Sequence, residues 1–343
     1  MTQIASGFSL PASAGQGARG SVLASAAQVR DRLDILTRPA ITKLESFQAN
    51  IDAVQGRMDL ARAGLDQIAS IASAFRARTA DLNGLSAPMV DSVAASARDA
   101  LRNVATALNA KYGDTYVFGG QDSTTAPVPQ AEAILSSGFF SGISTAVGTL
   151  AANGAAATAA ATLATASSNA VGTSPFTTTL SQPVAVLDGL KDRVPVGEGR
   201  QVQVGILASA NSDAVSGGTS TTGSYMRDIM RGLATLGSLS SSQMNDPGFA
   251  ALVADVRESL TGAETALGMD AGVLGDRQAT IREDKSRLEQ AGTALRGQVS
   301  NVEDVDMAET LSRLSLTQTQ LQASYQLLAG LQSLSLTKFL PAG

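Results

Sequence analysis

A long heptad seam near the start of the chain constrains its fold more than any other feature. Between residues 44 and 82, steps of three and four residues alternate without a slip, and eleven of the twelve seam positions are apolar. Such a seam is typical of a helix that buries one stripe against another helix. The positions are Leu44, Phe47, Ile51, Val54, Met58, Ala61, Leu65, Ile68, Ala72, Phe75, Thr79 and Leu82.

A second seam near the C-terminus offers a partner for the first. An amphipathic pattern then continues over residues 300–340. Ser300 and Glu303 there fit a capping box at a helix start, and a solvated acidic turn is the alternative. Because each apolar stripe needs cover, we predict a mainly α fold. Its centre is a long antiparallel helical bundle or coiled coil formed by the N- and C-terminal segments. The second seam consists of Phe249, Val253, Val256, Leu260, Ala263, Leu267, Ala271, Leu274, Ile281, Leu288, Leu295, Val299 and Val302.

Several local signals predict where the first helices are interrupted. Residues 1–20 are rich in Ser, Gly and Ala, and we expect them to be mobile. Pro39 predicts a kink or break, because proline disfavours helical geometry in the residue before it. Asn83-Gly84 and Pro88 predict a helix end, and a further amphipathic helix follows over 93–112. The segment 113–120 then predicts a turn followed by a short strand or hairpin arm.

The middle of the chain has a different composition from its ends. No charged residue occurs from 133 to 187, and the stretch shows no obvious helical seam. Residues 177–187 and 194–207 resemble strands, the second around a Gly-Glu-Gly turn. We therefore predict a partly ordered, β-containing inserted domain over 121–225. The terminal helices are assigned to 1–38 and 306–343, and the helical bundle domain to 39–120 and 226–305.

The composition argues against catalysis and against several kinds of ligand. The chain has no His and no Cys, so Ser-His-Asp triads and thiolate or histidine zinc sites are excluded. Its net charge of −5 disfavours a nucleic-acid partner, and the absence of a long apolar run disfavours membrane insertion. The G-x-G-x-x-G match at 15–20 lacks a preceding strand, and the acidic cluster at 303–309 lacks the glycine of a calcium loop. We expect no enzyme activity, no cofactor and no metal.

Two segments of the chain resemble the flagellin family. The first is the loop Tyr112, Gly113, Asp114, Thr115, Tyr116, Val117, Phe118, Gly119 and Gly120. The second comprises the acidic run 300–309 together with Leu-Gln-Ala-Ser-Tyr-Gln at 321–326 and Leu-Ser-Leu at 334–336. With the helices of 44–112, the resemblance covers about two-thirds of the chain. One departure is the interval 36–43, which lacks the Leu-Ser-Ser-Gly element that filament flagellins usually carry.

The resemblance implies a structural subunit of the bacterial flagellum, most closely one that joins the hook to the filament. A filament-forming flagellin is the alternative, and a type III-exported adhesin or translocator-like binding protein is a third hypothesis. The implied partners are copies of itself or homologous flagellar subunits (a hook-associated protein and flagellin) and an export chaperone. The implied location is the extracellular flagellum. The expected assembly residues on the terminal helices are Val22, Val29, Leu33, Leu36, Leu311, Leu314, Leu321, Tyr325 and Leu328.

Overall fold

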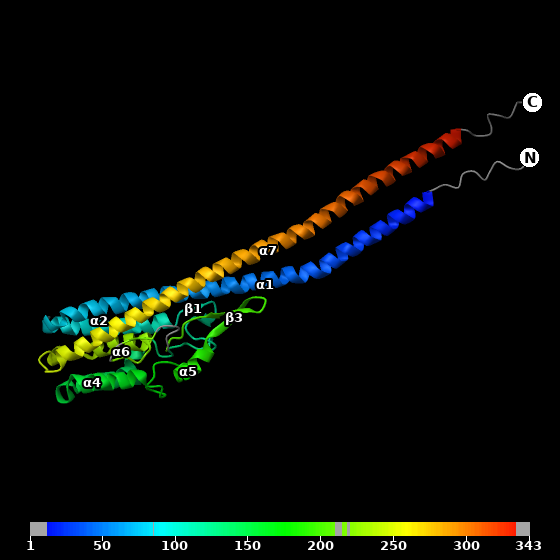
Figure 1. The fold of residues 1–343 in the computed structure, drawn as a ribbon. Helices are drawn as coiled ribbons and strands as arrows, with labels where there is room; N and C mark the ends of the chain where they lie inside the picture. Colours follow the sequence, from blue (N-terminus) through cyan, green and yellow to red (C-terminus); the bar gives the residue numbers. More distant parts are fainter. Residues whose placement is uncertain (1–11, 85, 210–214, 218–219, 334–343) are drawn as a thin grey trace, which may run out of the picture. The chain divides into compact units, whose positions relative to one another are not determined.

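The computed structural model describes residues 12–84, 86–209, 215–217 and 220–333. Side chains at 12–34, 36, 83, 184, 302–307, 309–310, 328–329 and 331–333 are outside this description. The chain forms two compact units (Figure 1). Unit 1 comprises Met1–Ser46 and Arg287–Gly343, and unit 2 comprises Phe47–Ser286. Two long helices, one near each end of the chain, run through both units.

Most of the described residues lie in α-helices, which confirms the predicted mainly α fold. The long helices of the two ends pack against each other, as the two seams predict. The only strands in the described residues form two short antiparallel hairpins. The elements are α1 (Ala12–Asp81), η1 (Leu82–Gly84), α2 (Ala87–Leu108), β1 (Lys111–Tyr112), β2 (Thr115–Tyr116), η2 (Ile134–Ser136), α3 (Gly138–Gly148), α4 (Leu150–Ser167), α5 (Val184–Leu187), η3 (Asp188–Leu190), β3 (Asp192–Gly197), β4 (Arg200–Val204), α6 (Tyr225–Ser238), η4 (Ser241–Gln243) and α7 (Phe249–Ser333).

Of the kink or break predicted at Pro39, the break is wrong, because α1 continues through this residue. A proline inside a helix loses one hydrogen bond, here to the carbonyl of Ile35, and costs about 3 kcal/mol. In a helix of 70 residues the remaining hydrogen bonds outweigh that local loss. Residues 12–20, expected to be mobile, are helical, and residues 1–11 lie outside the described part. The predicted helix start at Ser300 is also wrong, because α7 is continuous there.

Unit 2 has the core that the two seams predict. The ten first-seam positions from Ile51 to Leu82 are all buried. The second seam is buried from Phe249 to Ile281. Arg76 of α1 donates from Nε to both carboxylate oxygens of Glu264 of α7, at 3.1 and 3.0 Å. The predicted helix end at Asn83-Gly84 is confirmed, and Pro88 lies in the first turn of α2.

The middle of the chain is more helical than its composition predicts. Its side chains Phe139, Ile143, Val147 and Leu150 recur every three or four residues and are buried, so a short seam was overlooked. Figure 1 shows α6 between α4 and α2, and α3 also packs on α6. The strand expected over 177–187 is wrong, because this segment forms turns and the short helix α5. The three-domain division stays a prediction.

The second strand prediction in the middle of the chain is confirmed. Strands β3 and β4 pair antiparallel around the Gly-Glu-Gly turn, in the register Val194 to Val202. Gly199 has φ +67°, a conformation that favours glycine in a tight turn. The turn chemistry therefore identified this hairpin correctly.

Candidate assembly surface

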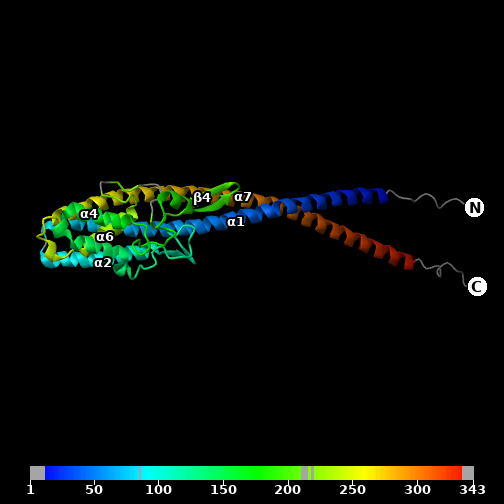
Figure 2. The ribbon, with the colours of Figure 1, turned by 90° about the horizontal axis from the view of Figure 1, so that it is seen from below.

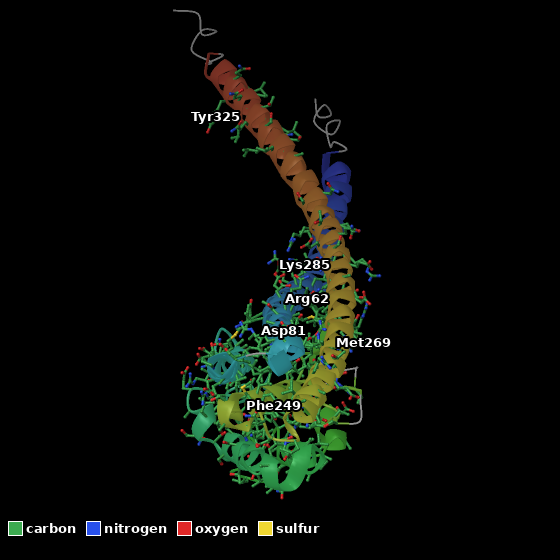
Figure 3. All side chains as sticks on the ribbon, turned by 90° about the vertical axis from the view of Figure 1, so that its left-hand side faces the viewer. Arg62, Asp81, Phe249, Met269, Lys285 and Tyr325 are labelled. Carbon is green, nitrogen blue, oxygen red and sulfur yellow. The ribbon has the colours of Figure 1, made fainter. Side chains whose placement is uncertain are left out.

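The part of α7 that belongs to unit 1 carries large apolar side chains that the single chain leaves exposed. Leu311, Leu314, Leu321 and Tyr325 are 62, 56, 50 and 68% exposed. Steps of three, seven and four residues place them on one face of the helix. Figure 3 shows Tyr325 on this part of α7, with its side chain projecting from the helix. We call these four residues the terminal stripe.

A second apolar pair lies on another face of the same helix segment. Leu316 and Leu327 are 50 and 70% exposed, and they are eleven residues apart, which is about three helical turns. At about 100° per residue, they point roughly away from the terminal stripe. The sequence analysis missed this pair, although its eleven-residue spacing was a usable signal. Apolar surface on two faces of one helix indicates more than one packing partner.

The other predicted assembly residues are located only by their backbone. Val22, Val29, Leu33 and Leu36 lie in α1 and Leu328 lies in α7, but their side chains are outside the described residues. Ile35 of α1 was not among the predicted residues and is 70% exposed. The structure therefore places four of the nine predicted side chains, and all four are exposed.

Burial of the exposed apolar side chains of α7 against a partner would be substantially favourable. Complete burial of one such side chain contributes about 1.5–3 kcal/mol. The terminal stripe, Leu316 and Leu327 are each half to two-thirds exposed. Covering the remaining surface of all six would contribute roughly 5–10 kcal/mol, before the entropic cost of association is subtracted. Exposed apolar surface of this kind is typical of interaction sites.

The loop that resembles flagellins forms an internal anchor in unit 2. Strands β1 and β2 form a two-residue hairpin whose turn contains Gly113, at φ +59°, and Asp114. The prediction of a hairpin arm is thus confirmed, but the strand ends at Tyr116, and Val117 and Phe118 are buried instead of extending it. The amide of Val117 donates to the carbonyl of Ala110 at 2.9 Å.

The two aromatic rings of this loop pack against two glycines of α1. A Cβ atom at Gly56 would overlap the ring of Tyr112, and one at Gly64 would lie 3.1 Å from the ring of Phe118. Phe118 is 0% exposed, whereas Tyr112 is 41% exposed. The loop then turns at Gly119 and Gly120, where a Cβ atom would lie 2.6 Å from the Asp122 carbonyl oxygen and 2.5 Å from that of Leu190. The sequence analysis did not identify Gly56 and Gly64 as the receiving positions.

Buried charges on α6 hold the uncharged middle of the chain in place. Arg227 donates to the carbonyl of Ala166 at 2.9 Å, to the carbonyl of Ser209 at 3.1 Å and to the side chain of Asn169 at 2.7 Å. Burial lowers its pKa to about 10, so the guanidinium stays charged near neutral pH. The insert supplies neutral acceptors, and α6 supplies the cation.

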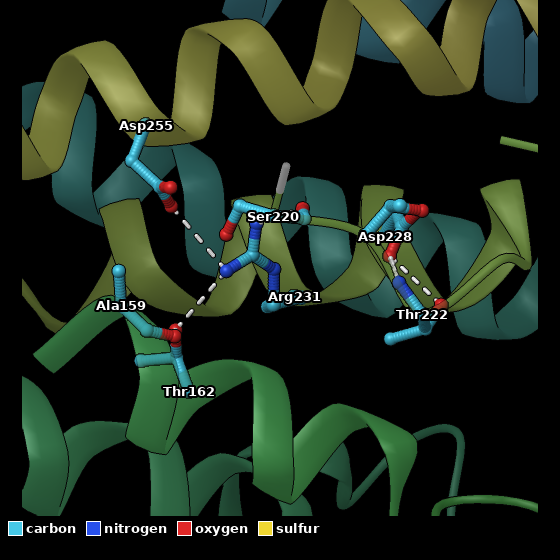
Figure 4. Close-up of polar contacts among 8 residues, drawn as sticks. Ala159, Thr162, Ser220, Thr222, Asp228, Arg231 and Asp255 are labelled. Carbon is cyan, nitrogen blue, oxygen red and sulfur yellow. Dashed lines mark hydrogen bonds and ion pairs between the residues drawn. The ribbon is translucent and has the colours of Figure 1, made fainter. Parts of the chain in front are cut away.

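One turn after Arg227, the buried Arg231 of α6 also bonds to the middle of the chain, and in addition to α7 (Figure 4). Arg231 is 1% exposed and contacts Thr162 and Asp255, both at 3.3 Å, while its Nη2 donates to the carbonyl of Ser220 at 2.8 Å. Asp228 accepts from the backbone and hydroxyl of Thr222, both at 2.8 Å. Apart from the Nε of Arg231, which is buried without a hydrogen-bond partner, these groups are bonded to the protein, which is typical of a structural network.

Clustered metal ligands and membrane-spanning helices are both absent from the described residues. Within them, no three acidic side chains gather closely enough to hold a metal ion. None of the helices described here combines the length and the apolar character needed to cross a bilayer.

One comparison with known proteins bears on these surfaces. Residues 258–340 match the family model described as the bacterial flagellin C-terminal helical region. This span contains the terminal stripe, Leu316 and Leu327. No curated protein matches the chain. The chain is therefore similar to bacterial flagellins over its C-terminal helical region, which is about a quarter of its length.

Proposed function

We propose that this protein is a structural subunit of the bacterial flagellum that assembles through the ends of its two long helices. The observation that carries this proposal is the exposed apolar surface on α7, which lies inside the segment that matches flagellins. A chain with a covered core in unit 2 and uncovered leucines in unit 1 can fold first and then assemble. Its partners are copies of itself or homologous flagellar subunits.

Within that role, we propose the hook–filament junction protein, also called hook-associated protein 3. The loop from Tyr112 to Gly120 and the interval 36–43 without Leu-Ser-Ser-Gly favour it. A filament flagellin is the second candidate, because the matched C-terminal region is common to the family. Either subunit would be exported by the flagellar type III route with a chaperone and would act outside the cell. An exported adhesin or translocator-like protein is the third candidate, and it would form no polymer.

The test of assembly is a charge placed in the terminal stripe. Leu321→Asp should abolish incorporation into flagella, because a carboxylate cannot be buried there without a partner. Thr319→Asp is the matched control, since Thr319 is exposed on the same helix and lies on a different face from Leu321. Both variants should yield exported monomer, and only Thr319→Asp should sediment with flagella. Normal incorporation of Leu321→Asp would contradict the proposal.

The position of the subunit in the flagellum distinguishes the first two candidates. Quantitative mass spectrometry of sheared flagella can separate hook-proximal from distal material. A junction protein should occur in few copies, confined to the hook-proximal fraction. A filament flagellin should occur along the whole length, and an adhesin should show no such distribution.

A further inference from the structure

The packing of α1 against α7 in unit 2 leaves the register of the two helices ambiguous at one end. The buried α1 residues Ile51, Met58, Leu65 and Ala72 follow one another at intervals of seven. On α7, Leu260, Leu267, Leu274 and Ile281 do the same. A slip of seven residues, about 10.5 Å along the axis, would therefore place apolar residues against apolar residues again.

Two polar contacts beside this seam share the ambiguity. Asp52 pairs with Lys285 at 2.7 Å, and the side chain of Gln278 donates to Asp59 at 2.8 Å. Asp66 follows Asp59 by seven residues. In the slipped register Asp59 would face Lys285 and Asp66 would face Gln278. An equivalent ion pair and an equivalent hydrogen bond would therefore form again. Neither these two apolar series nor these two polar contacts can select the observed register.

The β3–β4 hairpin makes contacts that do not repeat every seven residues. Asp192 of β3 pairs with Arg57 of α1 at 2.5 Å, and Arg200 of β4 pairs with Asp284 of α7 at 2.8 Å. The side chain of Asn50 also donates to the carbonyl of Pro195 at 3.1 Å. Figure 2 shows the hairpin beside both helices.

We propose that the β3–β4 hairpin is a strap that sets the register of α1 against α7 in unit 2. The strap contacts both helices from one short, hydrogen-bonded ribbon, so a slip of either helix breaks an ion pair. Seven residues from Arg57, position 64 is a glycine, and position 50 is an asparagine. At the same distance from Asp284, positions 277 and 291 are Arg and Ala. After a slip of seven residues, α1 and α7 therefore offer the strap no equivalent partners. This inference holds whichever flagellar role the chain has.

Cysteine cross-linking of the purified full-length chain tests the strap, because the chain contains no Cys. Asp52→Cys with Lys285→Cys reports the observed register, and Asp59→Cys with Lys285→Cys reports the slipped one. Arg57→Glu breaks one end of the strap, and the swap with Asp192→Arg restores the ion pair. The ratio of slipped to observed cross-links is the readout.

Arg57→Glu should raise the ratio by about fivefold, the factor that corresponds to about 1 kcal/mol. The charge swap with Asp192→Arg should return the ratio to its starting value. Arg102→Ala, which breaks an exposed ion pair within α2, should leave the ratio unchanged. An unchanged ratio in Arg57→Glu would overturn the proposal. An equal rise on Arg76→Ala would also overturn it, because the register would then be set at the Arg76–Glu264 contact.

Circular dichroism shows whether the Arg57→Glu variant keeps its helical structure, which the cross-linking test requires. A variant that loses its helical signal is replaced by Arg200→Gln, which removes the ion pair at the other end of the strap. The same ratio and the same outcomes then apply.

Discussion

Replacing Phe118 by Ala should destabilise unit 2 strongly while leaving the terminal stripe unchanged. Phe118 is 0% exposed, its ring faces Gly64 of α1, and its carbonyl accepts from the amide of Ala208 at 3.0 Å. Truncating a buried Phe to Ala costs about 3–5 kcal/mol, through lost burial and the cavity left behind. In a domain of this size, that corresponds to a fall in Tm of roughly 6–20 °C.

The assay for this prediction is urea unfolding of the monomer followed by far-UV circular dichroism. Tyr112→Ala in the same loop is the matched control, because its ring is 41% exposed and should cost about half as much. A loss below about 1 kcal/mol for Phe118→Ala would refute the view that this loop is an internal anchor.

Three further predictions concern the middle of the chain and α2. Arg227→Ala should cost about 3 kcal/mol and raise hydrogen exchange near Ala166, because several buried acceptors lose their donor; unchanged exchange there would contradict this. Replacing residues 136–207 by a short Gly-Ser linker should lower the unfolding midpoint of unit 2, because α6 loses the cover of α3 and α4; an unchanged midpoint would count against it. Ser241 donates to Asp91 from its hydroxyl and its amide, and these bonds lower the pKa of Asp91. Because this carboxyl has a lowered folded-state pKa, its contribution to stability is present above its unfolded pKa and lost as pH falls. Ser241→Ala should raise the pKa of Asp91 toward its ordinary value in an NMR titration, and an unmoved pKa would show that the hydroxyl is not the cause.

Periodicity predicted the parts of this fold that repeat. The first seam from Ile51 to Leu82 is buried because a sustained three-four spacing leaves one stripe to cover. The β3–β4 hairpin was predicted because a Gly-Glu-Gly turn between alternating residues has few other solutions. The break expected at Pro39 did not occur, because a local penalty competes with a helix of 70 residues.

Features that depend on tertiary contacts could not be read in the same way. The uncharged segment from 138 to 167 is helical because its own short seam packs on α6, which also supplies the charged partner Arg227. Gly56 and Gly64 look like weak helix positions until the rings of Tyr112 and Phe118 are placed over them. Of the candidate assembly site, the terminal stripe was predicted from its spacing. Leu316 and Leu327 were not predicted, because the spacing of the terminal stripe indicates only one apolar face of the helix.

Hydrogen exchange measured by mass spectrometry on monomer and on intact flagella tests the central claim most directly. The account predicts that protection in residues 311–327 rises sharply on assembly, because the terminal stripe, Leu316 and Leu327 become covered. Protection in residues 51–68, which are already packed in unit 2, should change little. Equal exchange of residues 311–327 in the two states would contradict the claim that this part of α7 is the assembly surface.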